Sequence, residues 1–319
     1  GRKIVAELQV LESLMREFAG RMSKSAAQVP HVAPPAQRGP ASAYAASIGA
    51  GGKLLETIRA SLEENRVDLY LQPIVSLPQR KLRYYEALSR LRAEDGSVIM
   101  PAQYMEVAAG AGLMSVVDNL LLFRCVQIVR RLTQKNREIG IFCNISGDTL
   151  ADAEFFPQFA DYMQANRDLA GQIIFEFNQD AVLKAGAVGE ENLARLASLG
   201  FALSMDHVQT LALDFLHLKG LGFRYLKVRA STLTAGMSGA KASVAAEDIK
   251  RLLARNGLNL IAERVEDEKT VVQLLDYAVD YAQGYLFGEP RAVREDSLRA
   301  GSREAMERAA PVIPLRRTG

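Results

Sequence analysis

Residues 68–92 read DLYLQPIVSLPQRKLRYYEALSRLR, two strand-like apolar runs joined by the four residues LPQR at 77–80. Apolar runs of this length and pattern are typical of β-strands. A connection of four residues is too short to contain a crossover helix, so the two strands are expected to pair antiparallel as a hairpin. The hairpin is therefore predicted to bring one antiparallel pair into the sheet that the rest of the chain builds.

Six further strand-like runs follow the hairpin, and helical patterns separate most of them. The predicted strands are 68–76, 82–92, 139–144, 172–177, 201–206, 224–228, 258–263 and 278–283, and the predicted helices include 117–133, 155–166, 190–199, 244–256 and 268–277. Eight strands that alternate with helices are typical of a TIM barrel. We therefore expect an α/β fold, a modified TIM (β/α)8 barrel with one antiparallel strand.

The flanking segments differ in character from the barrel. Residues 1–23 repeat apolar side chains in alternating steps of four and three, which predicts a coiled-coil helix joining two copies of the chain, or else a helix docked on its own chain. Residues 24–52 are rich in Ala, Pro and Gly and predict a linker. The barrel is expected over 53–297, beginning with an amphipathic helix at 53–65, and a tail is expected over 298–319.

The composition excludes several classes of protein. Lys and Arg number 39 against 37 Asp and Glu, a formal net charge of +2. The overall charge therefore gives no indication of a nucleic-acid polymer or a membrane surface as partner. Cys125 and Cys143 lie in apolar stretches without paired-cysteine spacing, which predicts small buried thiols instead of a disulfide or a zinc cluster. No apolar run reaches about 18 residues, so no segment here is predicted to span a bilayer.

Polar residues stand at or just past the ends of the apolar runs. They are Glu86, Asn144, Glu176, Asp206, Lys227, Glu263 and Gln283. Strands of a TIM barrel deliver their last side chains to one shared mouth, so these residues are predicted to form one site. The carboxylate and amide oxygens suit a hard divalent cation, and Lys227 and Arg90 suit a phosphate. For any one of these residues taken alone, a solvated or salt-bridged position is the alternative.

Six short motifs extend this interpretation. They are YLQPI at 70–74, EALSR at 86–90, CNIS at 143–146, LKV at 226–228, AERVE at 262–266 and QGYLFG at 283–288. In order and spacing they resemble the EAL domain of bacterial cyclic di-GMP phosphodiesterases, over about 53–290. The resemblance implies a modified TIM barrel that binds cyclic di-GMP at its C-terminal mouth. In active members it implies two metal ions that activate a water for attack on one phosphodiester.

The resemblance also implies roles for individual residues. It assigns the shell of a first Mg²⁺ or Mn²⁺ ion to Glu86, Asn144, Glu176 and Asp206. It places Lys227 and Glu263 near the attacking water or a second metal. The residues expected to contact cyclic di-GMP are Gln72, Glu86, Leu88, Arg90, Asn144, Asp206, Lys227, Arg229, Glu263, Glu266, Gln283, Phe287 and Pro290.

Four positions depart from the family pattern. His207 replaces a second metal-bridging aspartate, Arg229 replaces the aspartate two residues after Lys227, Gln179 replaces a glutamate that pins a loop, and Arg264 replaces a glycine. A unit charge on Arg229 about 4 Å from a divalent cation costs on the order of 8 kcal/mol at an effective dielectric of about 20. We therefore predict a degenerate domain that is not an enzyme, with a vestigial first metal site and no required cofactor.

Two of these residues leave alternatives open. Arg229 is expected either to neutralise a ligand phosphate or to pair with Asp206 or Glu263 in an empty mouth. His207 is expected to be a packed or hydrogen-bonded histidine, with ligation of a softer metal as the alternative.

The functional prediction is a catalytically inactive receptor for cyclic di-GMP. The alternatives are a weakly active cyclic di-GMP phosphodiesterase and a scaffold that binds no nucleotide. The order of coiled coil, Ala/Pro linker and degenerate EAL domain also resembles a bacterial flagellar assembly regulator. That resemblance implies flagellar and polar protein partners and a cytoplasmic domain at the cell pole, tethered to the inner membrane by segments upstream of Gly1. A homodimer through the N-terminal helix is predicted from the apolar pattern of residues 1–23.

Overall fold

The computed structural model describes residues 41–135, 139–239 and 243–293. The predicted coiled coil, the predicted linker up to residue 40 and the predicted tail lie outside the described residues. Residues 47–292 form one compact unit, and this unit contains the barrel and its polar site.

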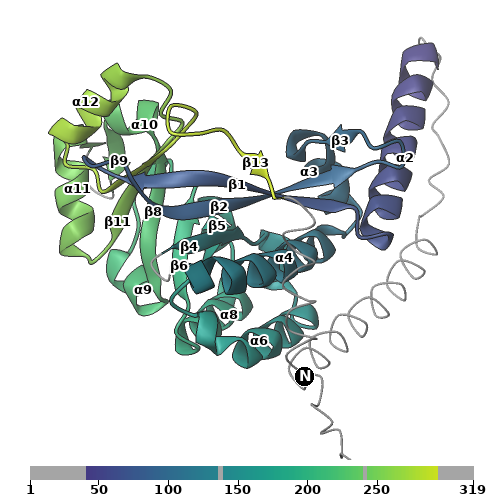
Figure 1. Ribbon diagram of the computed structural model, residues 1–319, viewed down its shortest axis with the longest axis horizontal. Helices are drawn as coiled ribbons and strands as arrows, with labels where there is room; N and C mark the ends of the chain where they lie inside the picture. The colour runs from purple at the N-terminus through teal and green to yellow at the C-terminus, as the bar shows by residue number, and fades with distance from the viewer. Residues whose placement is uncertain (1–40, 136–138, 240–242, 294–319) are drawn as a thin grey trace, which may run out of the picture. The chain divides into compact units, whose positions relative to one another are not determined.

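Eight strands close into a barrel (Figure 1). β1 runs antiparallel to both of its neighbours, β2 and β12, and the remaining neighbours pair parallel. In order around the barrel the strands are β1 (Val67–Ser76), β2 (Lys81–Arg92), β4 (Gly140–Asn144), β5 (Ile173–Asn178), β6 (Ala202–Asp206), β8 (Phe223–Arg229), β11 (Asn259–Glu263) and β12 (Tyr281–Gln283). The structure confirms the predicted barrel, its hairpin and its single antiparallel strand.

Helices connect the parallel strands along the outside of the barrel (Figure 1). Five of them show a helical period in the sequence: α4 (Met114–Lys135), α6 (Phe155–Ala165), α8 (Gly186–Ser198), α11 (Ala246–Arg255) and α12 (Glu268–Asp276). Each covers a helix predicted from that period. Shorter helical segments follow strand ends or precede strands: α5 (Gly147–Ala151), η1 (Arg167–Leu169), α7 (Gln179–Leu183), α9 (Phe215–Gly220) and α10 (Ala230–Thr234).

Several small elements were not predicted. They are β3 (Val98–Ile99), α3 (Pro101–Gly110), β7 (Thr210–Leu211), β9 (Met237–Gly239), β10 (Ser243–Val244) and β13 (Arg291–Ala292). Strands of two or three residues are too short to show a period, so the sequence pattern gives no signal for them. α3 begins with Pro101, a residue that the first turn of a helix tolerates because its missing N–H would be unbonded there.

The helix before the barrel is longer than expected. α2 spans Ala41–Glu63, whereas the sequence predicted a helix from residue 53 and a linker up to residue 52. The segment 41–50 contains five alanines, and Ala has the highest helix propensity of all residues. The helix therefore continues through the glycines at 49, 51 and 52, which the sequence prediction had assigned to the linker.

One end of the barrel interior is apolar. Ile74, Phe142, Ile174 and Ile261 form a buried cluster there, and Tyr84, Tyr225 and Tyr281 pack against it. The Tyr84 ring meets Phe142 edge to face, with 5.3 Å between ring centroids, a favoured aromatic geometry. The Nζ atom of Lys227 lies 5.0 Å from the centroid of Phe142, so the polar part of the interior begins directly beyond this cluster.

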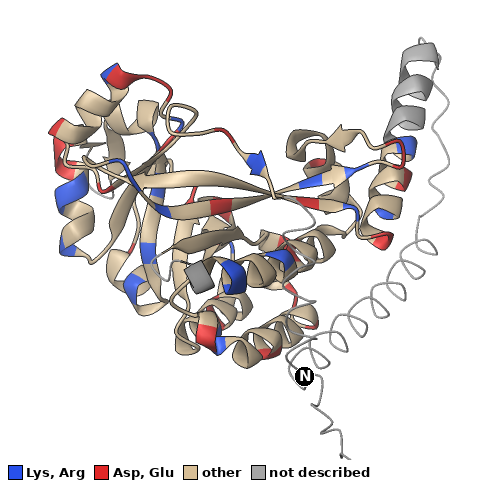
Figure 2. Ribbon diagram, in the orientation of Figure 1, with Lys and Arg blue, Asp and Glu red and all other residues tan. Residues whose placement is uncertain are grey.

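Three further expectations concern the whole barrel. Cys125 and Cys143 are buried and free, as predicted. None of the helices in the described ranges is both long enough and apolar enough to cross a bilayer. Figure 2 shows basic and acidic residues interspersed along the helices and strands, in agreement with the nearly balanced charge of the chain.

Candidate functional site

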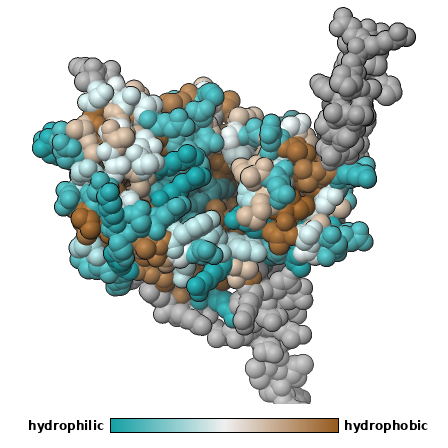
Figure 3. All heavy atoms as spheres, turned by 90° about the horizontal axis from the view of Figure 1, so that it is seen from above, coloured by the Kyte–Doolittle hydropathy of each residue, from teal (hydrophilic) through white to brown (hydrophobic). Residues whose placement is uncertain are grey.

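The polar side chains predicted from the strand ends do meet at one end of the barrel. Register pairs place them on neighbouring strands: Gln72 lies opposite Glu86, Asn144 is level with Glu176, and Arg229 is level with Glu263. Parallel strands deliver their C-terminal residues to the same edge, so the topology itself assembles this site. Figure 3 shows hydrophilic residues in the hollowed centre of the face seen from above.

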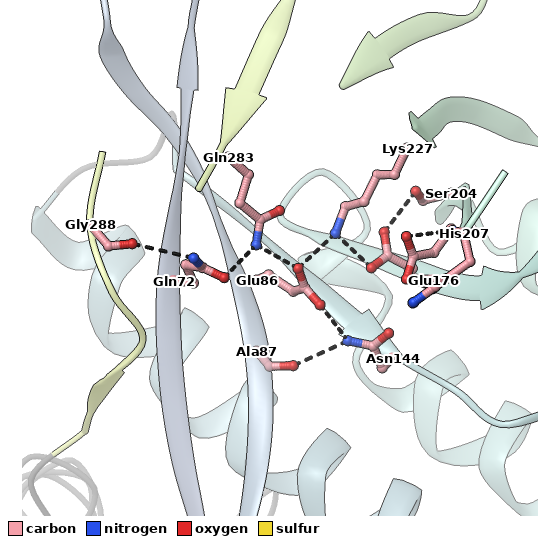
Figure 4. A network of polar contacts seen from close by, with 11 residues as sticks. Gln72, Glu86, Ala87, Asn144, Glu176, Ser204, His207, Lys227, Gln283 and Gly288 are labelled. Atoms are coloured by element: carbon pink, nitrogen blue, oxygen red, sulfur yellow. Dashed lines mark hydrogen bonds and ion pairs between the residues drawn. The ribbon is translucent and has the colours of Figure 1, made fainter. Parts of the chain in front are cut away.

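Lys227 is the centre of the network in Figure 4. Its ammonium donates to Glu86 Oε2 at 2.9 Å and to Glu176 Oε1 at 2.7 Å, and its side chain has no exposed surface. Glu176 accepts a second bond from Ser204 Oγ at 2.8 Å, and Asn144 Nδ2 donates to Glu86 Oε1 at 3.0 Å. Lys227 therefore orients two carboxylates from β2 and β5.

Gln283 continues the network towards β1 (Figure 4). Its Nε2 donates to Glu86 Oε2 at 2.6 Å and to Gln72 Oε1 at 2.9 Å, and Gln72 Nε2 reaches the Gly288 carbonyl at 3.3 Å. The Oε1 atom of Gln283 is buried and has no hydrogen-bond partner in the described part of the chain. A buried acceptor without a partner indicates that something else satisfies it, such as a ligand, a cation or a water.

Asp206 and His207 form a pair at the end of β6. His207 Nδ1 lies 2.5 Å from Asp206 Oδ2, and the His207 backbone N–H donates to Asp206 Oδ1 at 2.6 Å. Burial alone would raise the pKa of Asp206, but its bonds to His207 and the charge of Lys227 outweigh burial and lower the pKa to about 2. The same bond raises the pKa of His207. His207 is thus a hydrogen-bonded histidine, the simpler of its two expected states.

The cluster holds more acid than base. Burial, followed by repulsion from Asp206, raises the pKa of Glu263 to about 8. Burial also raises the pKa of Glu176. Burial opposes the charge of Lys227, yet Glu176 and Glu86 outweigh it and raise the pKa of Lys227 above its usual value. Four carboxyl groups around one ammonium form a site that would gain stability from an additional cation.

A cavity of about 360 Å³ opens at this end of the barrel. Ten of the residues predicted to contact the ligand line it: Gln72, Glu86, Leu88, Arg90, Asp206, Arg229, Glu263, Glu266, Gln283 and Pro290. Three predicted contacts, Asn144, Lys227 and Phe287, are absent from the lining. Lys227 is fully buried beneath Glu86 and Glu176 and therefore does not reach the cavity surface, so its contact with the ligand stays a prediction.

The cavity also contains residues that were not predicted as contacts. They are His207, Arg264, Gly284 and Tyr285. Gly284 was within a quoted motif, and His207 and Arg264 were noted as departures from the family pattern, so a signal existed for all three. Tyr285 is 62% exposed and stands in the same motif as Gly284, QGYLFG at 283–288.

Gly284 explains why the segment after β12 lies so close to β11. A Cβ atom at this position would stand 2.1 Å from the Val265 carbonyl oxygen, far inside van der Waals contact. The Val265 N–H donates to the Gln283 carbonyl at 3.0 Å, and the Leu286 N–H donates to the Val265 carbonyl at 3.3 Å. Only glycine permits this approach, which joins two walls of the cavity.

Arg229 does not make the ion pair that was considered for it. Asp206 pairs with His207, and no ion pair between Arg229 and either Asp206 or Glu263 occurs in the described ranges. Arg229 is exposed at the end of β8 and lines the cavity. This leaves its guanidinium available to an anion.

Gln179 pins the loop that follows β6. Its Oε1 accepts from the backbone N–H of Gln209 at 2.9 Å and of Thr210 at 3.3 Å, and its Nε2 donates to the Thr210 carbonyl at 2.8 Å. The amide can both donate and accept. The departure from glutamate at this position therefore keeps the loop anchored to β5 and α7.

The donor chemistry fits a hard divalent cation. Glu86, Asn144, Glu176 and Asp206 offer only oxygen ligands, which Mg²⁺ and Mn²⁺ prefer. The side chains of the described residues are not arranged as a ready group of three or more His, Cys, Asp or Glu ligands, because Lys227 lies between two of the carboxylates.

Comparison with known proteins agrees with this geometry. The model of the EAL domain family matches residues 55–290. The cyclic di-GMP phosphodiesterase PdeB of Shewanella oneidensis is 27% identical over 73% of this chain and 28% of its own length. The cyclic di-GMP phosphodiesterase PdeF of Escherichia coli is 26% identical over 75% of this chain and 32% of its own length. The chain thus spans about a third or less of these relatives.

Solved structures share the fold. The PaMucR phosphodiesterase in complex with c-di-GMP superimposes with a TM-score of 0.64 at 24% identity, over 75% of this chain and 97% of its own. The FimX EAL domain of Pseudomonas aeruginosa bound to c-di-GMP superimposes with a TM-score of 0.62 at 20% identity, over 75% of this chain and 96% of its own.

These relatives overturn one prediction. The prediction from Arg229 and His207 that the chain is not an enzyme is wrong, because PdeB and PdeF, which align with most of the chain, are both phosphodiesterases. The Coulomb estimate for Arg229 assumed a fixed distance of about 4 Å to a metal. An exposed arginine at the end of a strand is free to turn away from such an ion, so the estimate overstated the penalty.

Proposed function

We propose, because this chain belongs to the EAL domain family, that its barrel binds cyclic di-GMP in the 360 Å³ cavity and hydrolyses one phosphodiester bond to a linear dinucleotide. The observation that carries the proposal is the convergence of four carboxylates from β2, β5, β6 and β11 beside Arg90, a residue that is 8% exposed and lines the same cavity. A divalent cation would match the carboxylates of this site, and a phosphodiester would match Arg90.

Arg90 is suited to hold a phosphate. It donates to the Ser89 carbonyl at 2.8 Å and lies over the Tyr70 ring, with 5.3 Å from Cζ to the centroid. Both contacts orient the guanidinium without neutralising its charge. A guanidinium held in this way can form two parallel bonds to phosphate oxygens at little further entropic cost.

Gln283 and Gln72 would meet polar edges of the ligand. The free Oε1 of Gln283 needs a hydrogen-bond donor, and a guanine base carries N–H donors. Since Gln283 Nε2 is committed to Glu86 and Gln72, the orientation of its amide is determined. The Oε1 atom of Gln283 therefore points in a fixed direction, and a ligand donor placed there would form a hydrogen bond with it.

The residues that would hold a cation are Glu86, Asn144, Glu176 and Asp206. Mg²⁺ or Mn²⁺ bound there supplies a Lewis acid for the phosphoryl oxygen and lowers the pKa of a water. Lys227 keeps the Glu86 and Glu176 carboxylates oriented. Glu263, with its pKa raised to about 8, carries a proton at neutral pH and is able to give it up when positive charge approaches.

The test is an incubation of the chain with cyclic di-GMP and Mg²⁺ or Mn²⁺, with chromatographic detection of the linear dinucleotide. We expect product with the wild type and a loss of at least about 100-fold in rate for Glu86→Gln. The matched control is Glu268→Gln, which removes an exposed carboxylate paired with Arg80. Absence of linear product at an enzyme concentration equal to that of the nucleotide would contradict the proposal.

The cellular role stays a prediction from the sequence. A part in flagellar assembly, a polar location and an upstream membrane tether rest on the resemblance described above, and a homodimer through residues 1–23 rests on their apolar pattern. The dimer is the most accessible of these to measurement. Light scattering of the chain and of a variant with Leu8 and Leu11 both changed to Asp, which disrupts an a/d seam, should give a dimer and a monomer respectively.

A further inference from the structure

Three guanidinium groups line the cavity without carboxylate partners. Arg90, Arg229 and Arg264 all contribute to its wall. Within the described ranges none of the three takes part in an ion pair. Charged groups that line a cavity are usually paired or hydrogen-bonded. Three guanidinium groups at one cavity, none of them neutralised by an ion pair in the described ranges, therefore favour an anionic ligand there.

The backbone holds Arg264 in place at an energetic cost. Its φ is 54°, in the left-handed region that a side chain with a Cβ atom disfavours. The bonds from Val265 to Gln283 and from Leu286 to Val265 fix the chain directly after it. This conformation keeps Arg264 in the cavity lining, and a strained residue held by its neighbours is a candidate for function.

The buried carboxylates and two of the three arginines occupy different parts of the site. Glu86 and Asp206 are buried in the barrel end, 7% and 5% exposed, whereas Arg229 and Arg264 are exposed at the ends of β8 and β11. An anion near the buried carboxylates is repelled unless a cation lies between them. An anion near the two exposed arginines is attracted by both, so a phosphate is favoured at the outer part of the cavity.

The kind of phosphate follows from charge and geometry. A phosphodiester carries one negative charge and two free oxygens. A terminal phosphate monoester carries nearly two charges at neutral pH and three free oxygens. Two guanidinium forks can together engage three oxygens, while a diester leaves part of their donor capacity unused.

We propose that the cavity binds a linear dinucleotide with a terminal phosphate monoester more tightly than the cyclic diester with the same bases, and that Arg229 and Arg264 contact the monoester. This inference rests on the proposed function, because such a dinucleotide is the product of opening one ring phosphodiester with water. Hydrolysis would then leave the product in the site, and its release would limit turnover.

The test is calorimetric titration of the chain with three ligands in the presence of EDTA, so that no divalent ion bridges the carboxylates to the ligand. The ligands are cyclic di-GMP, the 5′-phosphorylated linear dinucleotide pGpG, and the same linear dinucleotide without its terminal phosphate, GpG. We expect pGpG to bind at least about tenfold more tightly than either of the others. Equal or tighter binding of the cyclic ligand overturns the inference and leaves the proposed function standing.

Variants assign the effect to the two arginines. Arg264→Gln and Arg229→Gln should each weaken pGpG binding by about tenfold and GpG binding by less than about threefold. Glutamine keeps much of the side-chain length and the same φ requirement at position 264, so the backbone strain is unchanged. Arg251→Gln on α11, where Arg251 is exposed and pairs with Asp248, is the matched control and should change neither affinity.

Each other outcome has a definite meaning. An unchanged preference for pGpG in both variants overturns the assignment to Arg229 and Arg264. An equal loss of pGpG and GpG binding shows that the arginines contact the bases or the internal diester, and also overturns it. If none of the three ligands binds, with or without Mg²⁺, the inference and the proposed function both fail.

Discussion

The ammonium of Lys227 lies 2.7 Å from the carboxylate of Glu176, and neither side chain has any exposed surface. Removing one member of a fully buried pair leaves the other charge without compensation. Glu86, also bonded to Lys227 at 2.9 Å, would lose its counter-charge at the same time. The pair therefore links the stability of the barrel to the geometry of its site.

Lys227→Met should destabilise the protein by about 3–5 kcal/mol, because two buried carboxylates lose their shared cation. Urea unfolding monitored by circular dichroism measures this change. Lys184→Met removes an exposed lysine that pairs with Asp180 on α7, and should change stability by less than about 0.5 kcal/mol. A loss below about 1 kcal/mol for Lys227→Met would show that the carboxylates simply take up protons and that the network tolerates it.

Asp118 should make stability depend on pH. Burial raises its pKa to about 6, in spite of bonds from Ser146 and Thr149, whereas an exposed aspartate titrates near 3.9. Because the folded-state pKa is the higher one, its contribution to stability is fully present below about pH 4 and is lost as pH rises through about 6.

The variant Asp118→Asn isolates this effect, since its amide does not titrate. The unfolding free energy of the wild type should fall relative to the variant by about 2 kcal/mol between pH 4 and pH 7. Urea unfolding at several pH values gives the difference, and Asp180→Asn, which removes an exposed carboxylate paired with Lys184, is the control. A difference that stays constant or grows with pH would contradict the pKa direction for Asp118.

Cation binding should release a proton from Glu263. With a pKa raised to about 8, this carboxyl is mostly protonated at pH 7, and a divalent ion favours its ionised form. Titration of Mg²⁺ in buffers of different ionisation enthalpy should show release of close to one proton at pH 7 and almost none at pH 9. Glu263→Gln should abolish the difference between the two pH values, and Glu268→Gln should not. An equal release at both pH values would exclude Glu263 as the source.

Gln179→Ala should loosen the loop after β6. The substitution removes two acceptor contacts and one donor contact to Gln209 and Thr210, so amide exchange at these positions should accelerate by about 10- to 100-fold. Hydrogen exchange read by mass spectrometry measures this, with peptides from α11 as the internal control. Gln179→Glu keeps the acceptors and should give an intermediate rate. Unchanged exchange in Gln179→Ala would mean that β7 pairing alone holds the loop.

Much of the fold was predictable because its signals are local. The hairpin at 77–80 and the long helices α4 and α11 show their periods within a single window of sequence, and the structure has them within a few residues of the predicted bounds. The two-residue strand β7 and the start of α2 were not predicted. In β7 the signal is shorter than one period, and in α2 the helix propensity of alanine opposed the linker composition.

The site divides in the same way. Glu86, Asp206 and Glu263 were predicted because each ends an apolar run, and parallel strands bring such residues to one edge wherever the sheet closes. Two features were not predictable: the complete burial of Lys227, and the backbone conformation that places Arg264 in the cavity lining. Lys227 meets Glu86 across 141 positions of sequence, and Arg264 depends on a backbone turn set by contacts with the segment after β12.

The amino-acid sequence by itself determined that this chain forms an eight-stranded barrel and that acidic and amide groups gather at one end of it, since both follow from the period and the order of its strands. Only the tertiary structure decided which of those groups are buried against one another and which face the cavity. Contacts between side chains depend on barrel closure, which brings together residues that are far apart along the chain and sets their distances to within hydrogen-bond range.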